Sequence, residues 1–240
     1  MGSSCRICDN ASDNVPLLAR EMMFGSRVEF RYFQCSRCQC LQIEAFPDDI
    51  AEHYPPNYYS FSPSGPRGER GWRRSLKSAA LSYRFGRQGG LGRLAAGVFT
   101  LPPEIASWLT ASGVRQDSRL LDVGSGQGHL LRQLAGWGFT SLTGADPFVS
   151  GDLSYPDGVK VLRRSLSEMS GEFDCIMMHH SFEHMDRPQA VLAEARRLLA
   201  RGGRLLVRIP LCSSAAFREY GPDWVQLDAP WMQLGSATAS

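Results

Sequence analysis

Hydrophobic and polar positions in the second half of the chain alternate between short apolar runs and segments with helical spacing. Residues 120–123, 141–146, 159–162 and 173–178 are predicted to be strands, and the almost continuous apolar run over 173–178 is typical of a central parallel strand. Between them, apolar residues three and four positions apart predict helices that begin near Leu130 and near Asp186. Gly202 and Gly203 are expected to end the second helix, before a further strand over 204–210. This order predicts an α/β fold with a doubly wound, Rossmann-like, mostly parallel sheet.

The first of these strands ends in an acid, Asp122, and leads into a loop with glycines at positions 124, 126 and 128. Glycine lets a ligand approach the backbone closely, and the start of the following helix presents free N–H groups. Strand, glycine turn and helix in this order are typical of a nucleotide-binding site. The Gly-x-Gly-x-Gly spacing differs from the Gly-x-Gly-x-x-Gly of dinucleotide-binding proteins. A glycine turn without a ligand is the alternative.

A second acid, Asp146, ends the next strand and precedes Pro147. An acid about 20 residues after a glycine loop can accept hydrogen bonds from both ribose hydroxyls of a nucleotide. It can also cap the helix that follows, and the two roles are compatible. We therefore interpret Asp146 as a ribose-binding residue.

The glycine loop, Asp146, the pair Glu183-His184 and the pair Gly202-Gly203 resemble motifs of class I S-adenosylmethionine (SAM) methyltransferases. The resemblance covers residues 119–210 and implies SAM as the cofactor, with the loop against its methionine part. It implies that the residues that bind SAM are Asp122, Gly124, Ser125, Gly126, Gly128, Asp146, Pro147, Ser165, Leu166 and His179.

Two Cys-x-x-Cys pairs lie near the N-terminus, Cys5/Cys8 and Cys35/Cys38. Two residues between thiolates let both sulfurs reach one tetrahedral Zn²⁺, and four cysteines leave no open position for water. The alternating segment 27–33 predicts a strand that leads into the second pair. We therefore predict a structural zinc ribbon over 1–53, with free buried cysteines as the alternative. Cys40 is a spare, and two further cysteines at 175 and 212 are expected in the core.

The cysteine pairs, together with Phe24-Gly25-Ser26 and residues 54–60, also resemble the ribbon that precedes the core of some sugar C-methyltransferases. This second resemblance implies a small-molecule acceptor of the sugar or glycan-precursor type.

Between ribbon and core we predict a connecting arm with helical segments over 54–112, followed by the SAM-binding domain over 113–240. Residues 67–93 hold eight basic residues and one acid. Such a segment attracts a phosphate-bearing substrate or an anionic surface, or it is the solvated face of a helix. Helical spacing within the arm is shown by Trp72, Leu76, Ala79, Ala80 and Tyr83.

The chemistry implied by SAM is in-line methyl transfer, for which a hydroxyl or enolisable C–H acceptor needs a base. His180 and His184 follow the strand over 173–178, where open sheets bind ligands, and are the predicted bases, with Glu183 as orienter. Alternatively these residues cap the loop and pack against the cofactor. The same residues match the His-x-x-Glu-His pattern of zinc peptidases. That pattern needs both histidines on one helix, whereas His180 is expected at the end of a strand, which argues against a zinc peptidase.

Composition adds exclusions. A net charge of +2 gives no case for nucleic acid, no stretch is long and apolar enough to span a membrane, and no secretory segment is visible. We expect a cytoplasmic protein.

The 30 residues after Pro210 are too few for the helix and two strands with which the resembling fold ends, so these strands are expected to be missing or truncated. Two hypotheses follow: an active methyltransferase, or an inactive SAM-binding scaffold or interaction protein with a structural ribbon.

Overall fold

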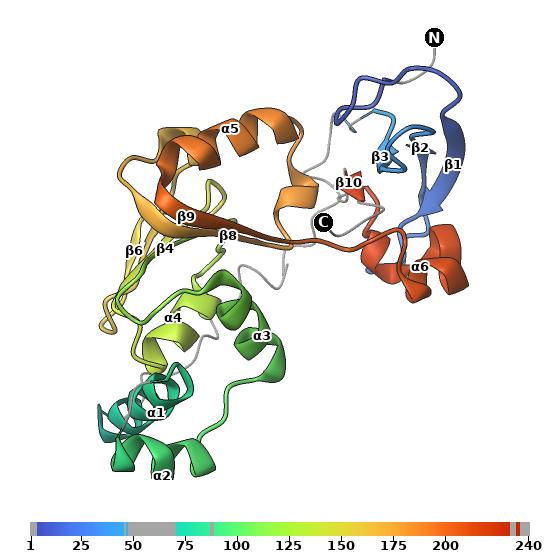
Figure 1. Ribbon diagram of the computed structural model, residues 1–240. Helices are drawn as coiled ribbons and strands as arrows, with labels where there is room; N and C mark the ends of the chain where they lie inside the picture. Colours follow the sequence, from blue (N-terminus) through green and yellow to red (C-terminus); the bar gives the residue numbers. More distant parts are fainter. Residues whose placement is uncertain (1–3, 46, 48–70, 87–88, 231–233, 236–240) are drawn as a thin grey trace. The chain divides into compact units, whose positions relative to one another are not determined.

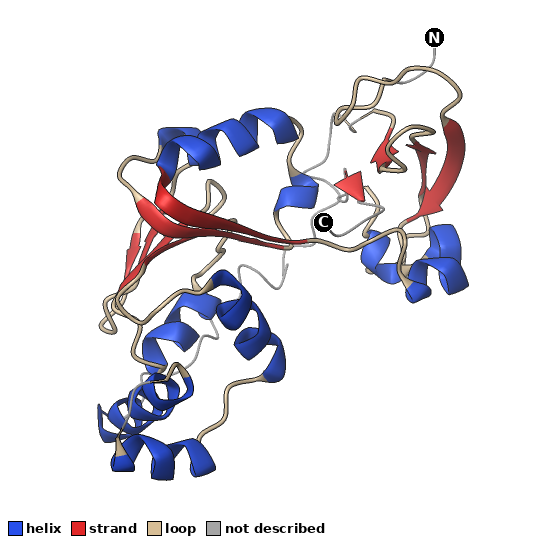
Figure 2. Ribbon diagram, viewed as in Figure 1, coloured by secondary structure: helices blue, strands red, loops and turns tan. Residues whose placement is uncertain are grey.

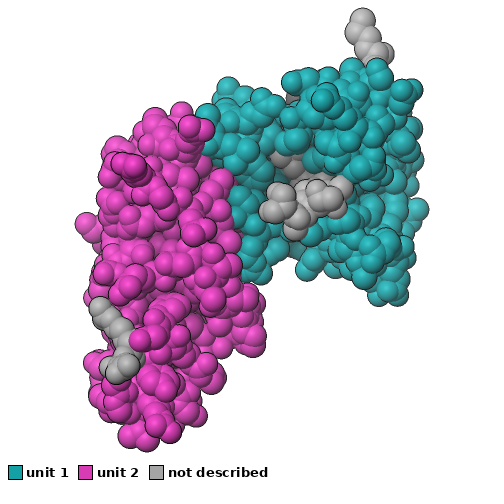
Figure 3. Space-filling view, viewed as in Figure 1, with its two compact units in different colours: residues 1–58, 180–193, 207–240 teal, residues 59–179, 194–206 magenta. Residues whose placement is uncertain are grey.

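The computed structural model describes residues 4–45, 47, 71–86, 89–230 and 234–235 (Figures 1 and 2). The chain forms two compact units (Figure 3). Unit 1 comprises residues 1–58, 180–193 and 207–240, and unit 2 comprises residues 59–179 and 194–206. Residues 54–70 and 87–88 of the predicted arm, including part of its basic segment, lie outside the described residues.

Unit 2 is built on a six-stranded sheet in the order β6-β7-β5-β4-β8-β9. Strand β4 pairs in parallel with β5 and with β8, and β5 pairs in parallel with β7, whereas the short β6 is antiparallel to β7. This confirms the predicted mixed α/β, Rossmann-like, mostly parallel sheet. The strands are β4 Arg119–Val123, β5 Ser141–Ala145, β6 Leu153–Ser154, β7 Lys160–Leu162, β8 Phe173–His179 and β9 Leu199–Arg208.

Helices cover both faces of this sheet (Figure 1). On one face, the side chains of Leu120, Cys175 and Met177 pack with Leu109 of α3 and Leu134 of α4 in one buried cluster. On the other face, the C-terminal half of α5 is buried at Ala195 and Leu198. The helices are α1 Gly71–Arg84, α2 Gly90–Val98, α3 Pro103–Ser112, α4 His129–Gly136 and α5 Pro188–Leu198, with the 3-10 turn η3 Leu166–Glu168.

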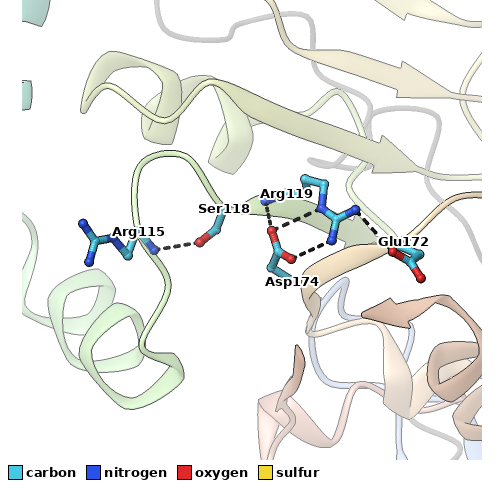
Figure 4. A network of polar contacts seen from close by, with 5 residues as sticks. All are labelled: Arg115, Ser118, Arg119, Glu172 and Asp174. Carbon is cyan, nitrogen blue, oxygen red and sulfur yellow. Dashed lines mark hydrogen bonds and ion pairs between the residues drawn. The ribbon is translucent and has the colours of Figure 1, made fainter. Parts of the chain in front are cut away.

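A polar network joins the N-terminal ends of β4 and β8 (Figure 4). The Asp174 carboxylate accepts hydrogen bonds from the backbone N–H of Arg119, at 2.7 Å, and from its guanidinium, at 2.8 Å. Glu172 lies 3.6 Å from the same guanidinium. Hydrogen bonds and the charge of Arg119 lower the pKa of Asp174. Because the two strands are joined at this end, their C-terminal ends are aligned at the opposite edge of the sheet.

The glycine pair after α5 lies elsewhere than the sequence predicts. Helix α5 ends at Leu198, and Gly202 and Gly203 lie inside β9 instead of ending the helix. Gly202 has a φ of +79°, and a Cβ at Gly203 would lie 3.0 Å from the carbonyl oxygen of Phe173. The glycines are therefore needed for a bend and a close backbone approach in the strand, and not for a helix cap.

Unit 1 contains an antiparallel sheet in the order β1-β2-β3-β10, with β1 Val15–Arg20, β2 Glu29–Gln34, β3 Leu41–Ile43 and β10 Leu234–Gly235. Strand β2 confirms the strand predicted over 27–33. The core of unit 1 contains side chains from the ribbon and from the C-terminal segment, namely Ala19, Tyr32, Leu41, Ile43, Cys212, Leu227 and Ala229. The remaining elements of unit 1 are η4 Phe182–His184, α6 Ala215–Tyr220, η5 Gly221–Asp223 and η6 Val225–Leu227.

The C-terminal segment joins the N-terminal sheet, which the sequence did not indicate. Leu234 and Gly235 pair with Gln42 and Leu41 of β3. In the part of the chain that the structure describes, the six-stranded sheet gains no strand after β9. Among the described residues, no helix has the length and apolar character needed to cross a membrane.

Candidate functional site

The glycine loop joins β4 to α4 and depends on backbone conformations that favour glycine. Gly124, Gly126 and Gly128 have φ values of +74°, +51° and +73°. The Gly124 N–H donates to the carbonyl of Ala145 at the end of β5, at 2.8 Å. A Cβ at Gly128 would lie 2.8 Å from Cγ2 of Val161. A side chain at any of the three positions would be strained by its positive φ, and at Gly128 it would also lack space.

Asp146 holds this loop against the end of β5. Its Oδ2 accepts a hydrogen bond from the Gly126 N–H at 2.8 Å, and its Oδ1 accepts one from the Phe148 N–H at 2.9 Å. Asp146 is 7% exposed, and the next residue, Pro147, is exposed. A carboxylate oxygen can accept more than one hydrogen bond, so both oxygens keep capacity for the hydroxyls of a ligand. The bracing role of this residue was not visible in the sequence.

Two further polar groups of the loop are buried. Burial raises the pKa of Asp122 to about 7, and the charge of Asp146 adds to the rise. The hydroxyl of Ser125 is buried and has no hydrogen-bond partner among the described residues. Gly144 on β5 makes room for it, since a Cβ there would lie 2.3 Å from this hydroxyl oxygen. Sequence reasoning missed Gly144, although a glycine inside a strand is a known sign of close approach.

The other predicted cofactor residues follow the C-terminal ends of β7 and β8. Ser165 begins the turn η3, where its hydroxyl donates to the carboxylate of Glu168 at 2.6 Å. Leu166 is buried. His179 ends β8, and its ring lies 5.1 Å from that of Trp108, at a tilt of 56°. All ten residues predicted to bind SAM belong to unit 2. Asp122 lies one residue before the end of β4, and the other nine end or follow β4, β5, β7 or β8.

These residues fit the cofactor that the sequence implies. Open parallel sheets bind ligands beyond the C-terminal ends of their strands, where the strand order reverses. Here β4 lies between β5 and β8, and the chain passes from β4 to β5 and β7 on one side before it returns to β8 on the other. The glycine backbone is open to close approach, Asp146 offers acceptors for hydroxyls, and the buried hydroxyl of Ser125 has no protein partner among the described residues.

The predicted catalytic residues form a short turn in unit 1. His180 has a φ of +52°, and its Nδ1 lies 3.4 Å from Oε1 of Glu183. Glu183 has a side chain only 2% exposed, and its Oε2 has no hydrogen-bond partner among the described residues. His184 ends the 3-10 turn η4, which lies against β10, and α5 begins only at Pro188. The two histidines do not share a helix, which removes the main requirement of the zinc-peptidase pattern.

A third carboxylate belongs to the same electrostatic environment. Asp228 lies between Leu227 and Ala229, which are both fully buried in the core of unit 1. Burial raises the pKa of Asp228 to about 6, and the imidazole of His184 opposes the rise. Its Oδ1 is buried without a partner among the described residues. No sequence signal connects this acid with the histidine turn, because more than 40 residues separate them.

The four predicted metal ligands converge. The sulfurs of Cys5 and Cys38 are 3.5 Å apart, those of Cys8 and Cys35 are 3.6 Å apart, and all four lie within 4.8 Å of one another. Ligand sulfurs 2.3 Å from a tetrahedral Zn²⁺ lie about 3.8 Å apart, whereas a disulfide needs about 2 Å. The arrangement therefore fits one ion held by four thiolates.

The two cysteine pairs have the same backbone geometry. The N–H of Cys5 donates to the carbonyl of Asn10, and the N–H of Cys35 donates to that of Cys40. In the opposite direction, the carbonyls of Cys5 and Cys35 accept from Asp9 and Gln39, which both have positive φ. Each pair is thus closed by its own backbone before any metal is considered.

Hydrogen bonds favour the thiolate form of Cys35, whereas burial raises the pKa of Cys38. Burial alone would raise the pKa of Cys35, but backbone N–H groups of Cys38 and Arg37 lower it to about 6. The Gln42 amide donates to the sulfur of Cys5 at 2.8 Å. Cys40 is buried close by but does not belong to the cluster of four sulfurs.

The structure defines a Rossmann-like domain with a glycine loop between β4 and α4. A family model described as a methyltransferase domain matches residues 100–239. The chain therefore belongs to this methyltransferase family, which confirms the class of enzyme that the sequence motifs predicted.

Solved structures of methyltransferases resemble the chain at low identity. One is the plantazolicin methyltransferase BpumL with a triazolic desmethylPZN analog and SAH, at 13% identity and a TM-score of 0.38, covering 67% of this chain and 57% of that one. Another is the magnesium protoporphyrin IX methyltransferase of Synechocystis PCC 6803 with bound SAH, at 16% identity and a TM-score of 0.39, covering 62% and 74%. The chain thus spans little more than half of the first of these proteins. No protein of curated function matches the chain.

The cysteine cluster predicts one Zn²⁺ per chain in protein purified without chelator. Cys35→Ser should lose the metal, because a tetrahedral site with three thiolates is open to water and to exchange. Cys40→Ser is the matched control and should keep a full equivalent, as measured by elemental analysis of the folded protein. Equal zinc content in both variants, or none in the parent protein, would contradict the four-cysteine site.

The raised pKa of Asp122 predicts a pH-dependent stability in the absence of cofactor. A carboxyl whose folded pKa lies near 7 contributes stability that is present below its unfolded pKa and is lost as pH rises toward 7. Asp122→Asn removes this titration, so its stability relative to the parent should increase by on the order of 2 kcal/mol from pH 5 to pH 8.

The control is Asp174→Asn, in which a carboxyl of lowered pKa is removed. This variant should be less stable than the parent by the same amount at pH 5 and at pH 8, because Asp174 is ionised throughout that range. Denaturant unfolding at both pH values measures the two differences. A difference for Asp122→Asn that does not change with pH would be inconsistent with the proposed protonation.

Proposed function

We propose that the protein is a SAM-dependent methyltransferase that transfers a methyl group to a small, sugar-type acceptor. The observation that carries this proposal is the glycine loop between β4 and α4, braced by the carboxylate of Asp146, in a chain of the methyltransferase family. The loop lies at the point in unit 2 where the chain order reverses between β4 and β8, which is where open α/β sheets bind ligands.

Bound SAM supplies a methyl group that is already electrophilic because it is attached to a sulfonium. The protein then has to hold the cofactor and exclude water. In our proposal, the backbone at Gly124 and Gly126 approaches the methionine part, with Asp122, Ser125 and Gly128 shaping the loop. Asp146 accepts hydrogen bonds from the ribose hydroxyls. The remaining contacts come from Pro147, Ser165, Leu166 and His179.

His184 is the proposed base that takes a proton from the acceptor. The histidine turn follows directly after His179, the last residue of β8. An imidazole has a pKa suited to proton transfer near neutral pH, and a carboxylate facing it favours its protonated form. Asp228, whose charge interacts with that of His184, is well placed to stabilise the imidazolium that forms. His180, paired with Glu183, is the second candidate base.

The buried carboxylate oxygens of unit 1 support an acceptor rich in hydroxyls. Oε2 of Glu183 and Oδ1 of Asp228 have no hydrogen-bond donor among the described residues. Buried polar atoms cost free energy unless a partner satisfies them, and sugar hydroxyls are suitable donors. The resemblance of the cysteine ribbon to that of sugar C-methyltransferases supports the same class of acceptor.

Cofactor binding provides the first test. Isothermal titration with SAM should show one site per chain in the zinc-loaded protein. Gly126→Val should abolish binding, because a branched side chain at a φ of +51° would occupy the approach to the cofactor. Gly171→Val is the matched control, since Gly171 also has a positive φ but lies before β8, with open space around its Cα. Unchanged affinity in Gly126→Val, or binding of NADH in place of SAM, would refute the assignment.

Turnover provides the second test. With methyl-labelled SAM and a panel of nucleotide-linked sugars, His184→Ala should lower the rate by about 10²–10⁴-fold while SAM affinity is kept. Glu183→Gln should lower it less, because the histidines remain. Loss of SAM binding in His184→Ala would make the residue a cofactor contact. Full turnover in His180→Ala, His184→Ala and the double variant would exclude a histidine base. SAM binding without turnover of any acceptor would favour the scaffold hypothesis.

A further inference from the structure

Helix α2 of unit 2 exposes a stripe of large aliphatic side chains. Leu91, Leu94 and Val98 are 64%, 74% and 76% exposed. Leu94 and Val98 follow Leu91 by three and seven residues, so the three side chains share one side of the helix. Single exposed leucines are ordinary on protein surfaces, but three in register on one helix face mark a surface with a partner.

The packing of α2 explains why this stripe cannot turn inward. The helix contacts α1 at Gly92, and the two buried residues of α2, Gly92 and Ala95, are both small. A Cβ at Gly92 would lie 2.8 Å from the carbonyl oxygen of Ala79 on α1. The Arg84 guanidinium of α1 also donates to the carbonyl of Ala96 at 2.9 Å. Small residues thus face α1 and large ones face outward, which reverses the usual arrangement of a surface helix.

The charge of the two helices identifies the kind of partner. Residues 71–98 contain six arginines and lysines and no acid. Within the part of the chain that the structure describes, no carboxylate forms an ion pair with Arg73, Arg84 or Arg93. Trp72 is 59% exposed on α1, with the guanidinium of Arg73 5.9 Å from its ring centre. The two helices together therefore expose aliphatic side chains, a tryptophan and positive charge.

We propose that the α1–α2 hairpin binds the surface of an anionic lipid bilayer. Helices that lie in the membrane interface present leucine and tryptophan to the acyl chains and arginine or lysine to the headgroups, as these two helices do. A nucleic acid would attract the arginines but gains nothing from Leu94 or Val98. A protein partner of ordinary composition does not require a surface free of acids. The association is peripheral, because neither helix is long enough to span a bilayer.

Sedimentation with vesicles tests this proposal without SAM or acceptor, so its result is independent of the proposed enzyme activity. The full zinc-loaded chain should bind vesicles of phosphatidylcholine with about one third phosphatidylglycerol at least tenfold more strongly than pure phosphatidylcholine vesicles. Binding should weaken as salt is raised, because the headgroup attraction is screened.

Variants separate the contributions of the stripe and of the charge. Leu94→Glu and Arg93→Glu should each reduce binding to anionic vesicles about tenfold or more, with unchanged melting temperatures. Leu192→Glu and Arg196→Glu, which alter exposed residues of α5, are the matched controls and should bind like the parent protein.

Three results would overturn the proposal. The first is no binding of the parent protein to anionic vesicles. The second is a parent oligomer that Leu94→Glu dissociates without any vesicle binding, which would make the stripe a protein interface. The third is binding that heparin competes away and that Leu94→Glu does not weaken, which would indicate a polyanion site without a lipid component.

Discussion

The hydrogen bond from the Gly126 N–H to the Asp146 carboxylate is the constraint on which the rest of unit 2 depends. It joins the loop after β4 to the residue that follows β5, so the C-terminal ends of these two adjacent parallel strands are held together. The positive φ angles of the loop glycines follow from this path of the backbone. The missing side chain at Gly144 is part of the same solution, because it leaves room for Ser125 beneath the loop. The Arg119–Asp174 contact at the other end of the sheet fixes the register of β4 with β8 and so completes the frame.

Local patterns were sufficient to predict most of this frame. Short segments between turn residues marked β4, β5 and β7, and the nearly continuous apolar run over 173–178 marked β8, because a central parallel strand is buried on both faces. The spacing of four cysteines was enough to predict their convergence, because ligand geometry restricts the chain at short range. The glycine pair at 202–203 misled the prediction, because glycine ends helices and also permits bends in strands. Asp228 and β10 could not be predicted, since their partners are distant in sequence and no periodicity carries that information.

Unit 1 shows how one small core can depend on segments from both ends of the chain. The ribbon strands supply Tyr32 and Ile43, whereas Leu227 and Ala229 come from the region after β9. Three antiparallel strands of this length bury little surface by themselves, and a metal ion together with added apolar residues is a common remedy in small domains. Asp228 lies between two of the buried residues, so the position of its carboxylate is determined by the packing of the ribbon. Any loss of order in the ribbon is therefore transmitted to the acid that faces His184.

Two buried acids beside the glycine loop, Asp122 and Asp146, couple ligand binding to the release of a proton. Asp122 has its pKa near neutrality because it is buried and because Asp146 already carries a negative charge close by. A ligand with positive charge placed near them favours the ionised form of Asp122, so a proton must leave as that ligand arrives. Heat measured on ligand binding would then include the ionisation heat of the buffer. Protons from the solution would then compete with the positively charged ligand for the Asp122 carboxylate.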